Sequence, residues 1–349
     1  MRTVSVNAST SYNILIGNGL LDECGELCLE VISPCKVCIV SDDVVAPLYL
    51  ERAEQSLKRA GFDTVSFVFP NGERSKTTAT LIELVEFLAK NRLTRTDCLV
   101  ALGGGVVGDM CGFAASIYLR GIKFIQIPTT LLAAVDSSVG GKTGVDLEAG
   151  KNLVGAFHQP SLVICDYSTL DTLPPEIFAD GCAEVIKYGV INDRAFFDSL
   201  SSGIKPQIET VIESCVINKR NVVEADEFES GARALLNLGH TVGHAIEVCS
   251  SLEIPHGSAV AIGMVIVMRA AVNMGLCPEG DLNALIKLLK KEELPTECRF
   301  GAAELASVAT ADKKRKGNSI TIVVPYSIGD TRLVKLPISE LEEFIEKGL

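Results

Sequence analysis

The chain has 349 residues, enough for about two domains of ordinary size, and 47% of them are hydrophobic, which is sufficient for two packed cores. Its formal net charge of −12 argues against a surface built for nucleic acid or for anionic membranes. The longest apolar run, 259–268, is too short to span a bilayer and fits a buried helix. Residues 1–6 alternate like a strand, not like a signal peptide, so we expect a cytoplasmic protein without a membrane or nucleic-acid partner.

The first half of the chain alternates apolar strands with helices. We expect strands at 35–40, 65–69, 98–102 and 124–127, and helices at 46–60, 76–90 and 110–119. This alternation predicts an α/β domain with a parallel sheet covered by helices on both faces. Ligands of such sheets bind beyond the carboxyl ends of the strands, where the loops of this chain carry glycine, proline, threonine and acidic residues.

A glycine-rich turn, Gly103-Gly-Gly-Val-Val-Gly-Asp109, joins the third of these strands to its helix. Glycines let a backbone approach an anion, and the helix that follows offers free N–H groups and the positive end of its dipole. The turn therefore predicts a phosphate site, although glycine required by turn geometry alone is the alternative. Asp42, after an earlier strand, is a candidate for binding the ribose hydroxyls of an adenosine.

The second half of the chain is mainly helical. Asp171-Thr-Leu-Pro-Pro175 breaks the strand pattern, so we place the domain boundary between residues 170 and 171, with one domain at 1–170 and the other at 171–349. Helices are expected at 176–192, 195–201, 205–227, 232–249, 258–274 and 281–291, followed by a hairpin of strands at 319–325 and 331–335.

Twelve cysteines lie scattered in apolar segments. In a cytosolic chain they are most simply reduced, buried and small hydrophobic residues. Cys24, Cys28, Cys35 and Cys38 are close enough in sequence for a zinc or redox motif, but no second C-x-x-C follows at a suitable distance. We therefore expect these cysteines to be part of the core.

Three of the four histidines fall within seventeen residues, at His240, His244 and His256. His240 and His244 are four apart, so a helix places both on one face. Glu184 stands upstream on a stretch that is also expected to be helical. A carboxylate and clustered imidazoles from separate segments are typical of a divalent metal site.

Basic residues in apolar or glycine-rich surroundings are informative in so acidic a chain. Binding of a multiply anionic small molecule requires positive charge in the pocket: arginine grips a carboxylate with two hydrogen bonds, and lysine supplies a point charge for phosphate. The candidates are Lys142, Lys151, Lys187, Lys219 and Arg233.

Several motifs appear in one order along the chain. They are Asn71-Gly-Glu-Arg-Ser-Lys76, the Gly103–Asp109 turn, Gln126-Ile-Pro-Thr-Thr-Leu131, Val135-Asp-Ser-Ser-Val-Gly-Gly-Lys-Thr-Gly144, Lys151-Asn-Leu-Val-Gly-Ala-Phe157, Ala183-Glu-Val-Ile-Lys-Tyr-Gly189, Arg233-Ala-Leu-Leu-Asn-Leu-Gly-His-Thr-Val-Gly-His-Ala-Ile-Glu247 and Asp312-Lys-Lys314. Over essentially its whole length the chain resembles the 3-dehydroquinate synthases. It departs from their usual pattern at Val242, where they have phenylalanine, and at Ser258, where they have glutamate.

The resemblance implies NAD in the first domain and a metal, zinc or cobalt in its place, in the second. The NAD site would include Asp42, Asn71, Glu73, Lys76, Gly105, Val106, Val107, Gly108, Asp109, Thr129, Thr130, Lys142, Lys151, Thr169, Leu170, Asp171 and Thr172. The metal would be held by Glu184, His240 and His256, with His244 beside the substrate. Hydroxyls and carboxylate of the substrate would be held by Asp136, Lys142, Lys187, Lys219, Arg233 and Asn237, and its phosphate by Lys142, Asn152 and either Lys313 or Lys314. Arg120 matches an arginine that reaches the phosphate across a homodimer interface in the family.

The implied reaction converts 3-deoxy-D-arabino-heptulosonate 7-phosphate to 3-dehydroquinate in the shikimate pathway, by transient oxidation, loss of phosphate, re-reduction and closure of a carbocycle. NAD is regenerated in each turnover. A related sugar phosphate cyclase, a metal-dependent polyol dehydrogenase that releases NADH, and a silent NAD-binding protein are the alternatives. Arg233, Asn237 and the Asp312-Lys-Lys314 run favour the dehydroquinate reaction because cyclases of substrates without a carboxylate tend to lose its partners. The full set of metal residues disfavours the silent protein.

Overall fold

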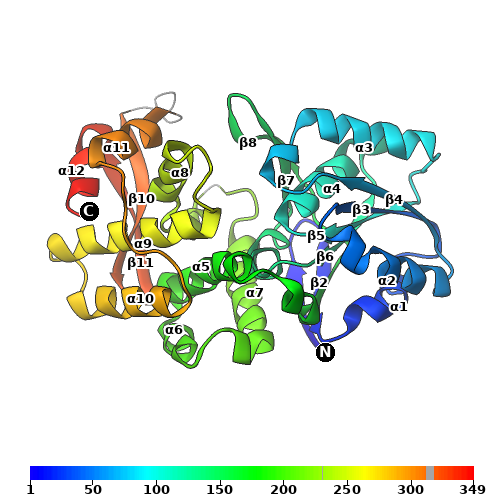
Figure 1. Cartoon of the computed structure of the whole chain (residues 1–349), viewed down its shortest axis with the longest axis horizontal. Coiled ribbons are helices and arrows are strands. Elements are labelled where there is room, and N and C mark those ends of the chain that lie inside the picture. Colours follow the sequence, from blue (N-terminus) through cyan, green and yellow to red (C-terminus); the bar gives the residue numbers. More distant parts are fainter. Residues whose placement is uncertain (230, 312–317) are drawn as a thin grey trace. The chain divides into compact units, whose positions relative to one another are not determined.

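A computed structural model describes residues 1–229, 231–311 and 318–349 (Figure 1). The chain forms two compact units: unit 1 comprises Met1–Leu173 and Cys215–Phe228, and unit 2 comprises Pro174–Ser214 and Glu229–Leu349. Unit 1 extends three residues past the boundary expected at 170, and it also takes in part of a helix from the second half of the sequence.

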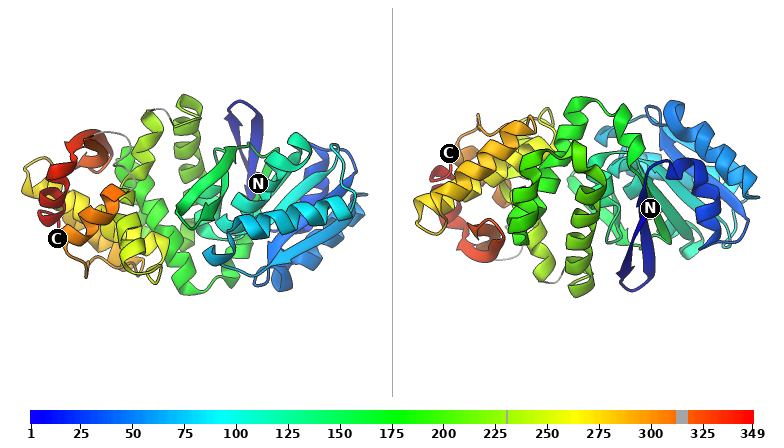
Figure 2. Two further views of the ribbon diagram at one scale, coloured as in Figure 1. Left: turned by 90° about the horizontal axis from the view of Figure 1, so that it is seen from above. Right: turned by 90° about the horizontal axis from the view of Figure 1, so that it is seen from below.

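Unit 1 contains a seven-stranded sheet in the order β1-β2-β9-β6-β5-β3-β4, in which only β1 and β2 pair antiparallel (Figure 1). The strands are β1 (Arg2–Asn7), β2 (Ser11–Gly17), β3 (Lys36–Asp42), β4 (Asp63–Phe69), β5 (Cys98–Gly103), β6 (Lys123–Pro128) and β9 (Leu162–Asp166). The expected parallel sheet is confirmed, and β2 and β9 are strands that the sequence pattern did not reveal. The β1–β2 hairpin stands out from the edge of the sheet in Figure 2.

Helices cover both faces of this sheet because successive strand residues point to opposite sides. On one face, Val37 and Ile39 of β3 pack with the helices α1 (Cys24–Leu29) and α2 (Ala46–Arg59). On the other face, Cys38 and Val40 pack with α3 (Thr78–Lys90) and α4 (Gly105–Ile117). The strands are therefore apolar on both faces, as buried parallel strands are.

Short elements beyond the strands complete unit 1. They are the 3-10 helices η1 (Leu20–Glu23), η2 (Glu73–Ser75), η3 (Tyr118–Arg120) and η5 (Tyr167–Thr172), the π-helix η4 (Ala133–Ser137), and the antiparallel hairpin of β7 (Lys142–Leu147) and β8 (Gly150–Phe157). The sequence pattern did not predict this hairpin. Gly144 and Gly155 explain why strands form here, because an added Cβ at Gly155 would lie 2.1 Å from the Thr143 carbonyl oxygen.

Unit 2 is mainly helical, as predicted. Its elements are α5 (Pro175–Asn192), α6 (Arg194–Ser199), η6 (Leu200–Ser202), η7 (Lys205–Gln207), the first part of α7 (Ile208–Ala225), η8 (Ala232–Asn237), α8 (His240–Cys249), α9 (His256–Asn273), α10 (Glu279–Lys291), α11 (Ala302–Ala311), η9 (Ile338–Glu340) and α12 (Leu341–Glu346). The predicted hairpin is confirmed as β10 (Ser319–Ser327) and β11 (Asp330–Pro337), which pair antiparallel. α9 is the one described helix that by length and composition alone could cross a membrane, but 72% of it is buried inside the protein.

The single helix predicted at 232–249 is wrong. The chain breaks at Gly239, whose φ of +78° is in the left-handed region, so that α8 begins at His240. Glycine is required there because an added Cβ would lie 2.7 Å from the Val260 carbonyl oxygen in α9. The break places His240 in the first turn of α8.

The cysteines have the structural role expected of them. All twelve are free, and Cys24, Cys28 and Cys38 are buried in the packed layers of unit 1. Burial raises the pKa of the Cys24 thiol to about 11 and that of Cys38 to about 12. Neutral thiols are poor nucleophiles and poor metal ligands, so the zinc or redox alternative is not supported.

Candidate active site

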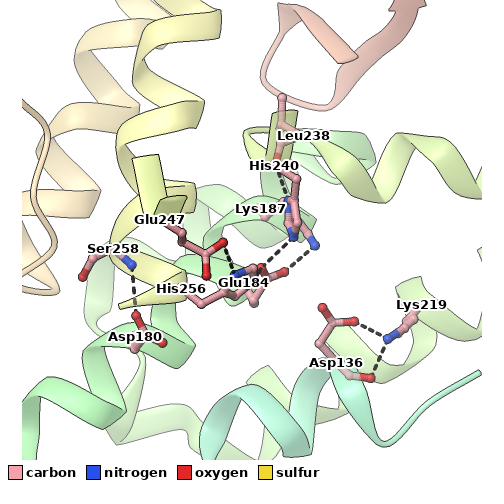
Figure 3. A network of polar contacts seen from close by, with 10 residues as sticks. All are labelled: Asp136, Asp180, Glu184, Lys187, Lys219, Leu238, His240, Glu247, His256 and Ser258. Atoms are coloured by element: carbon pink, nitrogen blue, oxygen red, sulfur yellow. Dashed lines mark hydrogen bonds and ion pairs between the residues drawn. The ribbon is translucent and has the colours of Figure 1, made fainter. Parts of the chain in front are cut away.

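Glu184, His240 and His256 come together in unit 2, as predicted, from three different helices (Figure 3). The Nε2 atoms of His240 and His256 lie 3.4 and 3.5 Å from the same oxygen, Oε1 of Glu184. The Glu184 side chain is fully buried in the middle of α5, whereas the two histidines are the first residues of α8 and α9. Three potential ligand atoms therefore converge within 4.8 Å of one another.

The second ring nitrogen of each histidine fixes its tautomer. Nδ1 of His240 lies 3.0 Å from the carbonyl oxygen of Leu238, and Nδ1 of His256 lies 3.4 Å from Oε2 of Glu247. Both partners are acceptors, so each Nδ1 carries the proton and donates. The Nε2 atoms then face the Glu184 carboxylate, and each would offer its lone pair to a cation bound there.

Burial and neighbouring charges give the two histidines different pKa values. Burial lowers the pKa of His240 to about 3, helped by the nearby Lys187 ammonium, so His240 is neutral at pH 7. Burial also acts to lower the pKa of His256, but hydrogen bonds to Glu184 and Glu247 outweigh it and raise this pKa to about 10. A cation in place of the His256 Nε2 proton would face Glu184, while the Nδ1–H group would still donate to Glu247.

The donor set fits a divalent metal ion of the zinc type. One carboxylate and two imidazole nitrogens leave a position for water or substrate, as catalytic zinc sites do. Lys187, one turn after Glu184 on α5, forms an ion pair with it and is itself buried. Lys187 and a divalent cation together would compensate the charge of the buried Glu184 carboxylate.

His244 lies beside the three predicted ligands. Its ring centroid is 5.4 Å from that of His240 and 6.0 Å from that of His256, and its side chain is exposed. With Glu247 and His256 it forms a second group of potential ligand atoms. An exposed imidazole next to the site is suited to proton transfer.

Ser258 does not face the metal residues. In Figure 3 its hydroxyl points away from Glu184, and its backbone N–H donates to Oδ1 of Asp180 at 3.0 Å. The Ser258 side chain lines a separate cavity of about 310 Å³ that includes Ile254 and Ile262. Serine at this position therefore removes no ligand from the cluster. The other departure, Val242, is a buried packing position.

In unit 1 the glycine-rich turn leads directly from β5 into α4, as predicted. Gly104 precedes the first turn of α4, whose N–H groups are available to an anion. Packing also requires glycine here, because an added Cβ at Gly103 would lie 2.6 Å from Val107 and one at Gly108 would lie 2.7 Å from Gln126. Geometry and anion binding thus both call for glycine in this turn.

Four charged residues predicted to bind the cofactor form one polar cluster in unit 1. Nζ of the buried Lys76 lies 2.6 Å from Oδ2 of Asp109 and 2.7 Å from Oδ1 of Asn152. Lys151 lies 3.8 Å from Glu73. Asn152, predicted to bind phosphate, is thus held among the residues predicted for NAD.

A second pair in unit 1 joins residues predicted to bind the substrate. The Lys219 ammonium donates to the Asp136 carboxylate and, at 2.6 Å, to the Asp136 carbonyl oxygen. Lys142 begins β7 and is exposed, as is Arg120, which has a φ of +68°.

The remaining residues predicted for the cofactor mostly make local contacts. Oδ1 of Asp42 accepts the N–H groups of Val44 and Val45, which leaves Oδ2 for a ligand. Asn71 donates to Asp43. The Tyr49 hydroxyl binds two members of the 169–172 segment. Also placed in this unit are Gly105, Val106, Thr129, Thr130, Thr169, Leu170, Asp171 and Thr172.

In unit 2, Arg233 and Asn237 both lie on η8, Arg233 fully buried and Asn237 exposed. Lys313 and Lys314 lie outside the described residues.

Two acidic residues near the predicted metal ligands were not predicted from the sequence. Glu247 contacts the His256 ring, and Asp180 contacts the backbone of α9, the helix that begins with His256. Their spacing carried the signal: Asp180 is one turn before Glu184, and Glu247 is three residues after His244 and seven after His240.

Sequence comparison agrees with this geometry. Residues 66–180 match the model of the 3-dehydroquinate synthase N-terminal domain, and residues 181–315 match that of the C-terminal domain. The chain belongs to the 3-dehydroquinate synthase family. A 3-dehydroquinate synthase of Streptococcus suis (strain 05ZYH33) is 44% identical over 348 residues, which cover 97% of this chain and 98% of that one. The family predicted from the motifs is thereby confirmed.

Solved structures of related cyclases have the same fold. A 2-deoxy-scyllo-inosose synthase complexed with carbaglucose-6-phosphate, NAD+ and Co2+ is 28% identical, with a TM-score of 0.89 and full coverage of both chains. The 2-epi-5-epi-valiolone synthase ValA of Streptomyces hygroscopicus, with NAD+ and Zn2+ bound, is 27% identical, with a TM-score of 0.88 over 99% of this chain and 98% of that one. The predicted fold class is confirmed.

Proposed function

We propose that the chain converts 3-deoxy-D-arabino-heptulosonate 7-phosphate to 3-dehydroquinate and phosphate, as a carbon–oxygen lyase of the shikimate pathway. The observation that carries this proposal is the buried Glu184 facing the Nε2 atoms of His240 and His256, in a chain of this family. When bound, NAD takes up and returns a hydride, and the divalent metal ion lowers the pKa of the substrate hydroxyl that is oxidised.

The proposed roles of the protein's own residues follow their charges. Glu184, His240 and His256 hold the metal ion, and Lys187 limits the negative charge at Glu184. Arg233 binds the substrate carboxylate, with Asn237 beside it on η8. His244, exposed next to the cluster, moves a proton during the reaction.

Unit 1 supplies the proposed cofactor site. The first turn of α4 binds the NAD pyrophosphate through its N–H groups, and Asp42 accepts hydrogen bonds from a ribose. Lys76 and Asp109 stabilise the neighbouring loop through their ion pair. Lys142, Asn152 and one of Lys313 and Lys314 bind the substrate phosphate, and Asp136 with Lys219 binds substrate hydroxyls.

One experiment separates this function from its alternatives. The protein is incubated with the heptulosonate phosphate, NAD and Zn2+ while phosphate and NADH are followed together. Phosphate without net NADH is the expected result, because the hydride returns to the substrate in each turnover. Net NADH would indicate a polyol dehydrogenase, and neither product would indicate a silent NAD-binding protein.

A related cyclase activity is the second candidate, since the inosose and valiolone synthases share the fold at 27–28% identity. Arg233 provides the test. If it binds a carboxylate, Arg233→Lys should weaken the reaction of the heptulosonate, because lysine cannot reproduce the bidentate contact. Faster turnover of glucose 6-phosphate, which has no carboxylate, would favour the second candidate.

We also propose a homodimer in which Arg120 serves the partner's phosphate site. Arg120 is exposed on η3, next to Leu119 and close to Ile117, whose exposed fractions are 39% and 42%. Arg120→Ala and Lys142→Ala variants, each inactive alone, should regain about a quarter of wild-type activity when mixed, because half of the dimers are mixed and each has one intact site. Proven heterodimers without activity would contradict the shared site.

A cytoplasmic location is proposed on the cysteines. All twelve are free and most are buried, and free thiols in such numbers persist in a reducing compartment. Maleimide labelling of protein unfolded directly from cell extract should modify all twelve, whereas blocked thiols would indicate oxidation.

A further inference from the structure

Of the three proposed metal ligands, His256 has the most exposed side chain. Its side chain is 33% exposed, whereas that of His240 is 13% exposed and that of Glu184 is fully buried. It is also the first residue of α9, after Pro255, and no side chain at the N-cap position accepts a hydrogen bond from this helix. The first N–H groups of a helix have no partner within the helix, so α9 needs other contacts to fix its first turn.

Asp180 provides such a contact to the backbone of α9. Its Oδ1 accepts the N–H of Ser258, the third residue of the helix, at 3.0 Å (Figure 3). A carboxylate at this position also faces the positive end of the helix dipole. The contact is close because residue 257 is glycine: an added Cβ there would lie 1.9 Å from the Asp180 carbonyl oxygen.

Asp180 stands four residues before Glu184, so both project from neighbouring turns of α5. The turn of α5 that contains Glu184 therefore supplies one proposed ligand. The preceding turn, which contains Asp180, holds the first turn of α9, where the proposed ligand His256 lies. The distance between Glu184 and His256 is set by this arrangement.

Glu247 holds the ring of His256 instead of its backbone. Its Oε2 lies 3.4 Å from Nδ1 of His256, and the residue is only 4% exposed. A carboxylate accepts a hydrogen bond from Nδ1–H, which leaves Nε2 facing Glu184 and available to a metal ion. Carboxylates that bind the outer nitrogen of a metal-ligating histidine also increase its basicity.

We propose that Asp180 and Glu247 are positioning residues of the metal centre: Asp180 fixes the first turn of α9, and Glu247 fixes the orientation and tautomer of the His256 ring. The inference rests on the proposed assignment of Glu184, His240 and His256 as ligands. Neither positioning residue needs to touch the metal or the substrate. Both residues hold His256 in the position and orientation that bind the metal, so replacing either one should weaken the affinity for metal.

The test measures metal binding directly. Zn2+ dissociation constants are determined by competition with a chromophoric chelator for the wild type and for Glu247→Gln, Asp180→Ala and His256→Ala. Loss of an outer carboxylate should weaken affinity by about 10- to 100-fold. The visible spectrum of the Co2+-loaded protein should shift in Glu247→Gln, because the ring orientation at the metal changes. At saturating Zn2+ much of the lost activity should return.

A matched control and two conservative variants complete the design. Glu253→Gln removes a carboxylate between α8 and α9 whose side chain is 75% exposed and lies 3.6 Å from the exposed Arg299, and it should leave affinity unchanged. Asp180→Asn keeps an acceptor for the Ser258 N–H but loses the charge, so its affinity should lie between those of the wild type and Asp180→Ala. Glu247→Asp should recover part of the loss in Glu247→Gln.

The outcomes separate the two proposals. If His256→Ala loses metal while Glu247→Gln and Asp180→Ala bind it like the wild type, the positioning roles are wrong and the ligand set stands. If His256→Ala retains stoichiometric metal, the ligand assignment itself is wrong. Thermal unfolding of the metal-free variants shows whether Asp180→Ala still folds; if it does not, wild-type affinity in Asp180→Asn would overturn the role of Asp180.

Discussion

Both units contain a carboxylate beside a buried lysine, but the surroundings of the pair differ. In unit 1, Asp109 pairs with Lys76 at 2.6 Å, and a second lysine, Lys151, lies near Glu73. In unit 2, Lys187 pairs with Glu184, which also faces His240 and His256, and Glu247 faces His256. The first cluster pairs carboxylates with ammonium groups, whereas the second combines carboxylates with imidazoles and is where we propose that a cation binds. Metal should therefore matter to unit 2 and hardly at all to the cluster in unit 1.

The largest effect is expected from loss of a ligand. His240→Ala should abolish metal binding and reduce activity by about a thousandfold or more, because metal stabilisation of the developing charge is worth several kcal/mol. Elemental analysis and the phosphate-release assay measure both, and chelation of the wild type should reproduce the loss reversibly. Stoichiometric metal in the variant would contradict the ligand set.

His244→Ala should separate proton transfer from metal binding. The variant should lose roughly 10²- to 10⁴-fold in kcat, as expected for a lost proton-transfer group, while retaining its metal. Steady-state kinetics with metal analysis on the same sample provides the test. A fall in metal content as large as that in His240→Ala would place His244 among the ligands.

Lys76→Met should affect the stability of unit 1 and leave metal affinity unchanged. Burial alone would lower the pKa of Lys76, but Asp109 and Glu73 raise it, so the ammonium is the form that compensates these carboxylates. Removing it leaves a buried charge, at a cost of about 3–5 kcal/mol. Denaturant unfolding gives the change, with the more exposed Lys151→Met as control, for which less than about 1 kcal/mol is expected. Altered Zn2+ affinity in Lys76→Met would mean that the two clusters are coupled.

The smallest effect on stability is expected at an exposed ion pair, with which the contributions of the buried pairs can be compared. The hydrogen bond from Arg52 lowers the pKa of Asp22 below its ordinary 3.8, although the Asp22 side chain is 57% exposed. A lowered carboxyl pKa stabilises the fold above that ordinary value, and this contribution is lost as the pH falls through the folded pKa. Asp22→Asn should cost less than about 1 kcal/mol at pH 7 and nothing once the pH has fallen below the folded pKa of Asp22. Urea titrations at the two pH values would reveal a larger, and therefore unexpected, contribution.

The sequence alone determined those features that depend on neighbouring residues. Strand and helix periodicity predicted β3 and α2 because side chains alternate every second residue in one and repeat every 3.6 in the other. The motifs around Gly103, Glu184 and His240 were sufficient for the family, and the clustered histidines pointed to a metal. The spacing of His240 and His244 also predicted their common helix face.

Only the tertiary structure decided which distant groups meet. The break at Gly239 depends on the close approach of α9, and no local pattern near residue 239 contains that information. The contacts of Asp180 with α9 and of Glu247 with His256 join residues whose helix faces are set by packing. Lys219 and Asp136 are 83 residues apart, and Lys76 and Asn152 are 76 apart. Pairing over such distances is fixed by how the helices and strands pack, because burial of apolar surface selects the arrangement and the charges must then be compensated within it.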